Sequence, residues 1–432
     1  MLDNFSQISG LKVNYSKSEL ALLGRSRMEI YTHNFSPGME MTLDKIKALG
    51  VNLPTNGKNE DLIKLNFEEK KQKIKDSVHS WSKRSLTLLG KVTIIKSLII
   101  PQITYLLSIL PNPEISYFKE IDKVIFSFLW DNKPPKLSRT MVLRKIAFGG
   151  LNVPDIYAYS KSVKFHWLQK VLNVPLKVLG KVQLRFPVLG NNFIFNYNLK
   201  PKNIENVPIK NTFWRDLLKY FFELRSKTTE PLQGDSIIWF NSLLKIEGKT
   251  LFYKELHDKC VTYLSNLVNE NGRFKTIDEI WGQFNCRINC LNYFGQVSMI
   301  KSKQINFETK TTNPCLLISR ILNSSSLSKV IYQQFMPSEL DFDTIKGLSK
   351  WRPELETDIY FENVFGIISK ITYDHKLQNF QHKLLQRILP TNIFWVKIGI
   401  KDSYRVAFVQ LLQIILCITF GNVLKSNNSG NK

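Results

Sequence analysis

At 432 residues the chain is long enough for two or three domains, and an apolar content of 43% excludes an intrinsically disordered protein. Sixty lysine and arginine residues against 36 aspartate and glutamate residues leave a net charge of +24, which points to a polyanionic partner, either nucleic acid or an anionic membrane surface. Five scattered cysteines imply no disulfide framework, and the stretch after Met1 lacks the apolar run of a signal peptide. We therefore expect an intracellular protein, in the cytoplasm or the nucleus, that is not secreted.

Positive charge is concentrated in two runs that also contain aromatic residues. Residues 64–96 carry nine lysine or arginine residues and three acidic ones, for a net charge of +6. Residues 132–170 carry eight, with Asp155 as the single acidic residue, for a net charge of +7. Each run is either a solubilising face or a nucleic-acid contact, and their closeness favours the contact.

The first 54 residues predict a small β region. The run that ends at Gly10 has the form of a helix end, with glycine in the C′ position. Residues 11–14 and 18–23 are typical of short extended runs around a polar turn, and the alternation of Leu49, Val51 and Leu53 predicts a further strand after Gly50.

Residues 61–112 predict two amphipathic helices with a basic rim. Asn66, followed three residues later by glutamate, has the form of a capping-box start, and apolar residues then keep helical spacing up to Trp81. Ser85 is a candidate N-cap for the second helix, which Pro101 should kink or end. The apolar face of that helix holds Leu88, Val92, Ile95 and Ile99, and the basic rim holds Lys83, Arg84, Lys91 and Lys96. The pattern fits either a buried helix with solvated lysines or a surface that grips a phosphate backbone.

The next block predicts a strong amphipathic helix over residues 115–129 that ends at Trp130, followed by a basic, proline-rich loop over residues 131–139. The Gly149-Gly150 pair either builds a tight turn or lets the backbone approach a phosphate closely. The pair is flanked by three cations that could bind the same phosphate, so a phosphate contact stays a possible interpretation: Arg139, Arg144 and Lys145.

The remaining chain predicts further helices joined by loops, over residues 157–168, 214–224 and 316–322. Cys286 and Cys290 have no further ligand at a useful spacing, so packing is favoured over a zinc site. His375 and His382 could pair on one helix face, although two surface histidines beside lysines is the favoured interpretation.

The tail from Val406 to Leu424 is nineteen mostly apolar residues, which borders on transmembrane length. Gln410 and Gln413 weaken a spanning helix. A second interpretation is a tail translated from a shifted frame or an intron.

The string Ile-Ser-Gly-Leu-Lys-Val-Asn-Tyr-Ser-Lys-Ser-Glu, at residues 8–19, is the most specific in the chain. Other strings that accompany it, in the same order, lie at residues 45–53, 81–105, 128–158 and 351–403. Together they resemble the reverse transcriptases of LINE-type (non-LTR) retrotransposons, from the end of the palm through the thumb to the C-terminal region. In that family, residues 8–19 would follow the catalytic Asp-Asp turn and residues 45–53 would form the primer-gripping hairpin.

The resemblance implies a mainly α fold with a small β remnant of a polymerase palm at the N-terminus. The implied segments are a palm remnant at residues 1–60, thumb-like helices at 61–112, a post-thumb helical and loop region at 113–230, a C-terminal helical region at 231–403 and a divergent apolar tail at 404–432.

Polymerase chemistry in this family needs carboxylates that hold two metal ions. No Asp-Asp pair occurs in the 432 residues, and the resemblance implies that the catalytic turn lies just before Met1. We therefore expect no cofactor in this chain, because magnesium would belong to the catalytic palm. The family often continues into a small zinc-binding knuckle, but Tyr404 and its neighbours stand in that place, so no metal is expected there.

The expected function is that of a reverse transcriptase segment that binds RNA or the backbone of an RNA–DNA hybrid, with no small-molecule substrate. The expected nucleic-acid-binding residues are Lys17, Lys83, Arg84, Lys91, Lys96, Arg139, Arg144 and Lys145. Lys17 matches the family position whose lysine lies near the incoming nucleotide. Two alternatives stay open: a portion of an active RNA-directed DNA polymerase whose upstream exons are missing, and a membrane-associated helical protein anchored by residues 406–424.

Overall fold

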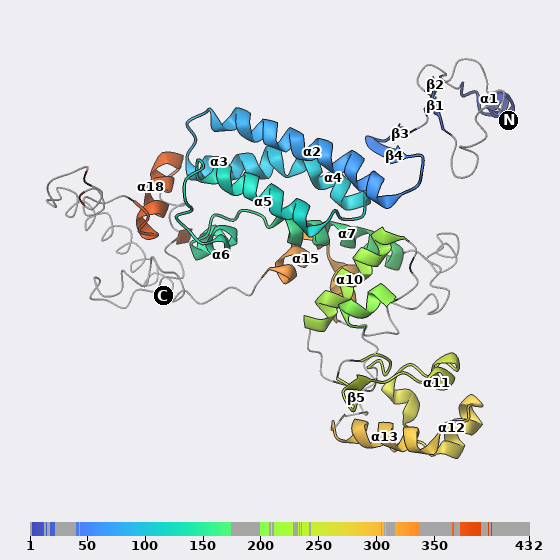
Figure 1. Ribbon diagram of the computed structural model, residues 1–432. Helices are drawn as coiled ribbons and strands as arrows, with labels where there is room; N and C mark the ends of the chain where they lie inside the picture. Colours follow the sequence, from blue (N-terminus) through green and yellow to red (C-terminus); the bar gives the residue numbers. More distant parts are fainter. Residues whose placement is uncertain are drawn as a thin grey trace, which may run out of the picture. The chain divides into compact units, whose positions relative to one another are not determined.

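A computed structural model describes residues 2–12, 18–21, 40–42, 44–173, 199–206, 211–227, 236–241, 243–303, 316–336, 365–366 and 372–389, with residues 14, 209, 232, 234, 305, 307, 396 and 399. Over these residues the chain is mainly α-helical, as the sequence predicts, with three two-stranded sheets (Figure 1). Packing divides the chain into two compact units. Unit 1 comprises Met1–Leu106, Pro113–Tyr159 and Pro337–Lys432, and unit 2 comprises Leu107–Asn112 and Ser160–Met336.

Unit 1 begins with the small β region that the sequence predicts. Helix α1 (Leu2–Ser9) ends at Gly10, whose φ of +71° is left-handed, which confirms the predicted helix end. Strand β1 (Glu19–Leu20) pairs in parallel with β2 (Glu40–Met41), and β3 (Lys45–Ala48) pairs antiparallel with β4 (Val51–Pro54). The predicted run at residues 11–14 is no strand where it is described, and residues 22 and 23 lie outside the described chain.

Strand β4 confirms the strand predicted after Gly50, while Leu49, the first residue of the predicted alternation, lies in the turn between β3 and β4. Leu49 and Gly50 both have left-handed φ angles, of 49° and 79°, which suits a two-residue hairpin turn. Strand β4 therefore starts at Val51, which is buried, while the Leu49 side chain is 91% exposed. Alternation alone could not locate the turn, because leucine is an uncommon residue at a left-handed position.

Helix α2 spans Asn59–Ser82, so the predicted start at Asn66 is wrong. Asn66 is buried within the helix, where its side-chain amide donates to the Asn52 carbonyl and its side-chain oxygen accepts from the Asn52 N–H, both at 2.8 Å. The amide thus joins the hairpin to α2, a use that a local capping pattern does not reveal. Phe67 and Ile74 are buried on the predicted apolar face.

The second predicted helix is a chain of three segments. Helix α3 (Leu88–Ile94) is capped by Thr87, whose hydroxyl accepts from the Gly90 N–H, and not by Ser85. A π-helical turn, η3 (Ile95–Ile99), follows, and α4 (Pro101–Ile109) leaves at a bend of 43°, which confirms the predicted kink at Pro101. All four residues of the predicted apolar face are buried: Leu88, Val92, Ile95 and Ile99.

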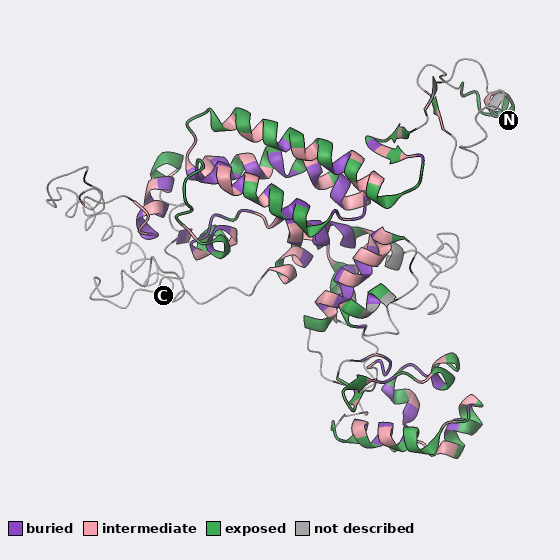
Figure 2. Cartoon of the chain, viewed as in Figure 1, coloured by how far each residue is buried: buried purple, intermediate pink, exposed green. Residues whose placement is uncertain are grey.

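Helix α5 (Ile115–Leu129) ends at Trp130 as predicted. A loop follows, then the short α6 (Arg139–Leu143) and the 3-10 turn η4 (Ile146–Phe148). Further along the chain, α18 (His375–Leu385) belongs to the same unit. Figure 2 shows the exposed residues along the outer face of α2 in green.

Unit 2 is built on α7 and α10. Helix α7 (Ile156–Asn173) carries the chain into the unit, and α10 (Thr212–Lys227) supplies a buried aromatic face with Tyr220, Phe221 and Phe222. The other elements are η5 (Pro201–Asn206), β5 (Lys245–Ile246), β6 (Lys249–Thr250), α11 (Lys254–Asp258), η6 (Leu264–Leu267), α12 (Ile277–Phe284), α13 (Cys290–Lys301), α14 (Leu316–Asn323) and α15 (Leu327–Phe335). The three helices predicted at 157–168, 214–224 and 316–322 lie within α7, α10 and α14 and are confirmed.

Candidate nucleic-acid interface

The junction of α2 and α3 presents two adjacent exposed cations, Lys83 and Arg84. The chain turns at this point, where the Arg84 N–H donates to the Trp81 carbonyl at 3.1 Å. The Arg84 guanidinium lies over the Trp81 ring, 4.3 Å from its centre. Stacking uses the face of the guanidinium, so its in-plane N–H groups remain able to meet a phosphate.

Lys91 is not on the basic rim that the sequence predicts. Its side chain is 5% exposed, and its ammonium nitrogen lies 2.5 Å from Asp131 Oδ1 and 3.4 Å from the Leu129 carbonyl oxygen. The lysine therefore ties α3 to the end of α5. This geometry removes Lys91 from the phosphate-binding set, because its side chain is buried and its charge is already paired with Asp131.

Lys96 lies within the π-helical turn η3 and is half-buried. Burial lowers the pKa of its ammonium, because the charged form loses solvation. The residue stays a prediction for phosphate contact, with less of its side chain available than at Lys83 or Arg84.

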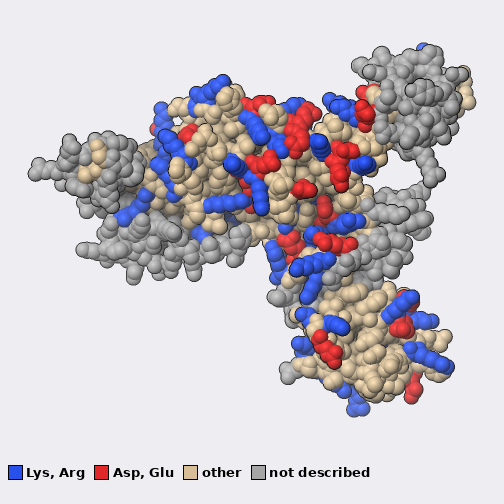
Figure 3. All heavy atoms as spheres, in the orientation of Figure 1, with Lys and Arg blue, Asp and Glu red and all other residues tan. Residues whose placement is uncertain are grey.

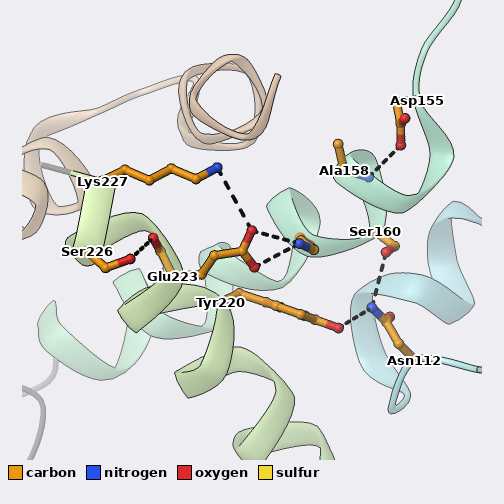
Figure 4. A network of polar contacts seen from close by, with 9 residues as sticks. Asn112, Asp155, Ala158, Ser160, Tyr220, Glu223, Ser226 and Lys227 are labelled. Atoms are coloured by element: carbon orange, nitrogen blue, oxygen red, sulfur yellow. Dashed lines mark hydrogen bonds and ion pairs between the residues drawn. The ribbon is translucent and has the colours of Figure 1, made fainter. Parts of the chain in front are cut away.

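Arg139 holds two carboxylates of unit 1. Its guanidinium lies 2.6 Å from Asp122 and 3.0 Å from Asp155. Burial raises the pKa of Asp122 to about 6. The charge of Arg139 opposes this increase, and the charge of Asp155 adds to it. Asp155 also accepts from the Ala158 N–H at the start of α7, at 2.9 Å (Figure 4). Arg139 is 48% exposed, but two acids already offset its charge, so we assign it a mainly structural role.

The Gly149-Gly150 pair builds a tight turn. Gly149 has a φ of +77°, and a Cβ placed on Gly150 would lie 2.0 Å from the Arg144 carbonyl oxygen. The two glycine N–H groups donate to the carbonyls of Ile146 and Lys145, at 2.9 and 3.1 Å. Since both donors are used within the turn, they cannot hold a phosphate, and the turn interpretation is correct.

The turn instead receives helix α18. The Gln386 side chain donates to the Gly149 carbonyl at 2.5 Å, and His382 Nε2 lies 3.2 Å from the Gly150 carbonyl oxygen. His382 is 2% exposed, so its prediction as a surface histidine was wrong, while His375 is exposed and bonds to Gln378. A carbonyl oxygen only accepts, so the imidazole carries its proton on Nε2.

The other flanking cations lie at the surface edge of this turn. Lys145 is exposed, and its ammonium is 5.7 Å from the centre of the Phe148 ring. Arg144 is half-buried, and its carbonyl accepts from the Asn152 N–H at 2.6 Å. The prediction at Lys17 lies outside the described residues.

The visible face of unit 1 mixes both signs of charge. In Figure 3, acidic atoms gather over the part of α2 and α5 nearest the hairpin, and basic atoms prevail towards α3 and α6. The net charge of a sequence run therefore overstates the basic surface, because several of its cations are paired or buried.

Two lysines of the second basic run lie in the interior of unit 2. Lys164 is fully buried on α7 and donates to the carbonyls of Leu107 and Leu110, the first at 2.8 Å. Burial lowers the pKa of Lys164 to about 7, and the charge of the nearby Asp216 carboxylate acts in the opposite direction. Lys161 pairs with Glu223, with contacts of 2.8 and 3.0 Å.

Figure 4 shows Glu223 with its ion-pair partners and, beside them, Asn112, whose side-chain amide donates to Ser160 and Tyr220 at 3.1 and 2.8 Å. The contacts fasten residues 107–112 to α7 and α10. Sequence reasoning missed them, because a lysine within a basic run has the same local signal whether its side chain points to water or to a carbonyl.

Within the described residues no three histidine, cysteine or acidic side chains lie close enough to hold a metal ion. Cys286 is buried in a loop before α13 and burial raises the pKa of its thiol, whereas Cys290 is exposed at the first position of α13. The two cysteines do not lie on one helix.

No single helix of the described chain is long and apolar enough to cross a membrane, while the bent pair Leu88–Ile99 and Pro101–Ile109 reaches the required length and composition. Residues 406–424 lie outside the described chain. A scan of the sequence against protein-family models finds no match.

Proposed function

We propose that the chain binds RNA or an RNA–DNA hybrid through backbone phosphates, as the thumb and C-terminal part of a LINE-type (non-LTR) retrotransposon reverse transcriptase. The observation that carries the proposal is the exposed pair Lys83 and Arg84, with Arg84 stacked on Trp81. The net charge of +24 supports a polyanionic partner.

The order of elements supports the polymerase assignment. A β-hairpin, β3–β4, lies where the resemblance implies a primer-gripping hairpin, and the helical block α2 to α4 follows it where a thumb is implied. Arginine and lysine contacts to phosphates read no base sequence, so the binding we propose is largely independent of sequence and sensitive to salt.

The proposal assigns binding and no polymerisation to these residues. Reverse transcription needs carboxylates that hold magnesium ions, and no Asp-Asp pair occurs in the 432 residues. Lys83 and Arg84 would hold a strand in place and take no part in the chemistry.

The test is the affinity of the full chain for a short single-stranded RNA, measured by fluorescence anisotropy at several salt concentrations. We expect the double variant Lys83→Gln/Arg84→Gln to bind roughly tenfold more weakly than the wild type. The slope of log affinity against log salt should fall by about 1.4, since each lost phosphate contact removes about 0.7 for a single strand.

The matched control is Lys254→Gln/Lys259→Gln, which removes the same charge from two exposed lysines on and beside α11. Its affinity should stay within about twofold of wild type, because these lysines are not part of the proposed site and the loss of net charge alone has a weak effect in salt. An equal loss of RNA affinity in both variants would show only a general effect of net charge and would refute the assignment of Lys83 and Arg84 as the binding site. An absence of RNA binding by the wild type would refute the function.

A further inference from the structure

A second group of cations on unit 1 combines Lys136, from the basic run at residues 132–170, with Lys383 on α18. Lys136 lies in the loop after α5, and its ammonium nitrogen is 3.5 Å from the Ile388 carbonyl oxygen, just beyond the end of α18. Lys383 lies on α18, the helix that also contacts α3. The loop after α5 therefore contacts the chain just beyond α18, about 250 residues further on, and the charge of Lys136 acts on Lys383.

The charges in this group do not balance. The ammonium groups of Lys136 and Lys91 repel that of Lys383, and the Asp131 carboxylate attracts it. Asp131 already pairs with Lys91 at 2.5 Å. Within the described residues, neither Lys136 nor Lys383 makes an ion pair, so the group keeps an excess of two positive charges.

The excess of positive charge affects the pKa of Lys383. Burial lowers the pKa of its ammonium, and the charges of Lys136 and Lys91 lower it further, while Asp131 acts in the opposite direction. An arrangement that disfavours its own charged form in the unbound protein is one that a bound anion stabilises.

The backbone around the group is fixed by hydrogen bonds. Asp131 and Asn132 adopt left-handed φ angles of 53° and 59°, and the Asn132 N–H donates to the Ser127 carbonyl at 2.9 Å. Helix α18 is held by the bonds of His382 and Gln386 to the glycine turn. The lysines therefore extend from two anchored segments, so that their repulsion is not relieved by movement of the backbone.

We propose that Lys136 and Lys383 form a subsite for a backbone phosphate of nucleic acid. The inference rests on the proposed function, and it adds a contact from α18 to those at the α2–α3 junction. Two lysines without enclosing N–H groups would hold an isolated phosphate ion weakly, whereas a polyanion that is already bound elsewhere adds such contacts at little further cost. Lys91 is a positioning residue here, since it holds Asp131 and the loop that carries Lys136.

The experiment uses the full chain, the same single-stranded RNA and the double variant Lys136→Gln/Lys383→Gln. We expect affinity to fall about tenfold and the salt slope to fall by about 1.4, as two phosphate contacts are lost. The Lys254→Gln/Lys259→Gln protein again serves as the charge-matched control and should bind like the wild type.

A second readout separates binding from a structural role. Amide hydrogen exchange of residues 130–138 and 375–388, measured without RNA, should be as slow in the Lys136→Gln/Lys383→Gln variant as in the wild type or slower, because the repulsion is removed. Faster exchange together with weaker binding would show that the lysines support the fold, and the subsite would be rejected.

The two proposals fail in different ways. Normal RNA binding by Lys136→Gln/Lys383→Gln, with weakened binding by Lys83→Gln/Arg84→Gln, would overturn the subsite and leave the proposed function intact. An absence of RNA binding by the wild type would overturn both. Inorganic phosphate added as a competitor at constant ionic strength should not displace the RNA, and displacement at low phosphate would identify a site for the free ion instead.

Discussion

Replacing Gly150 with alanine would place a methyl carbon 2.0 Å from the Arg144 carbonyl oxygen and 2.5 Å from the Arg144 Cβ atom. Neither distance is sterically allowed, and the first obstacle is backbone, so the turn must open. Opening would break the bond from the Gly150 N–H to the Lys145 carbonyl and the bond from the Asn152 N–H to the Arg144 carbonyl.

The same change would detach α18. The bonds from Gln386 to the Gly149 carbonyl and from His382 to the Gly150 carbonyl depend on the present path of the turn. With these two, four hydrogen bonds would be lost. At about 1 kcal/mol each, the variant should lose about 4 kcal/mol of local stability.

The assay is amide hydrogen exchange of the full chain, read over residues 144–153 and 375–388. Both segments should exchange faster in Gly150→Ala, together, by a factor of several hundred if exchange follows local opening of about 4 kcal/mol. The control is Gly282→Ala in α12, where an added Cβ meets nothing within 4 Å and alanine favours the helix. Unchanged exchange in Gly150→Ala, accompanied by loss of RNA binding, would refute the turn and restore the phosphate interpretation.

Three further predictions concern buried titratable side chains. Burial lowers the pKa of His382 below its ordinary 6.5, so on acidification the unfolded chain binds a proton before the folded chain does. The free energy of unfolding of the wild type should therefore fall as the pH drops below about 6.5, and it should fall less in His382→Gln. Urea unfolding at several pH values measures both. The pKa of Lys164 is lowered to about 7 from 10.5, so the free energy of unfolding of unit 2 should increase as the pH rises from 7 towards 10.5. Lys164→Met should abolish this increase and should lose about 2 kcal/mol of stability, because two carbonyls lose their hydrogen-bond donor. An increase that persists in Lys164→Met would contradict the assignment. Lys91→Met should destabilise α3 by about 1–2 kcal/mol and, because Lys91 positions the loop that carries Lys136, should weaken RNA binding no more than Lys136→Gln/Lys383→Gln does. A larger loss of RNA binding without destabilisation would return Lys91 to the interface.

The helices were largely predictable, because helical periodicity is a local property of the sequence. Residues 115–129 gave the correct helix with its correct end at Trp130, and Pro101 gave the correct kink. The start of α2 was not predictable from Asn66, since asparagine serves equally well as a helix cap and as a buried partner of a neighbouring strand.

The lysine and arginine side chains were much less predictable. Lys91 pairs with a carboxylate forty positions away, Lys164 caps the end of α4, and Arg139 joins two acids from different segments. His382 reaches a carbonyl 232 positions earlier in the chain. Each of these pairings is set by tertiary packing, which charge counting along the sequence does not contain.

The most direct test of nucleic-acid binding is the affinity of the full chain for two short single-stranded RNAs of unrelated sequence, between about 50 and 200 mM salt. The account predicts similar affinities for the two RNAs and a linear decline of log affinity with log salt for both. Absent binding at the lowest salt, or an affinity that salt does not change, would contradict it.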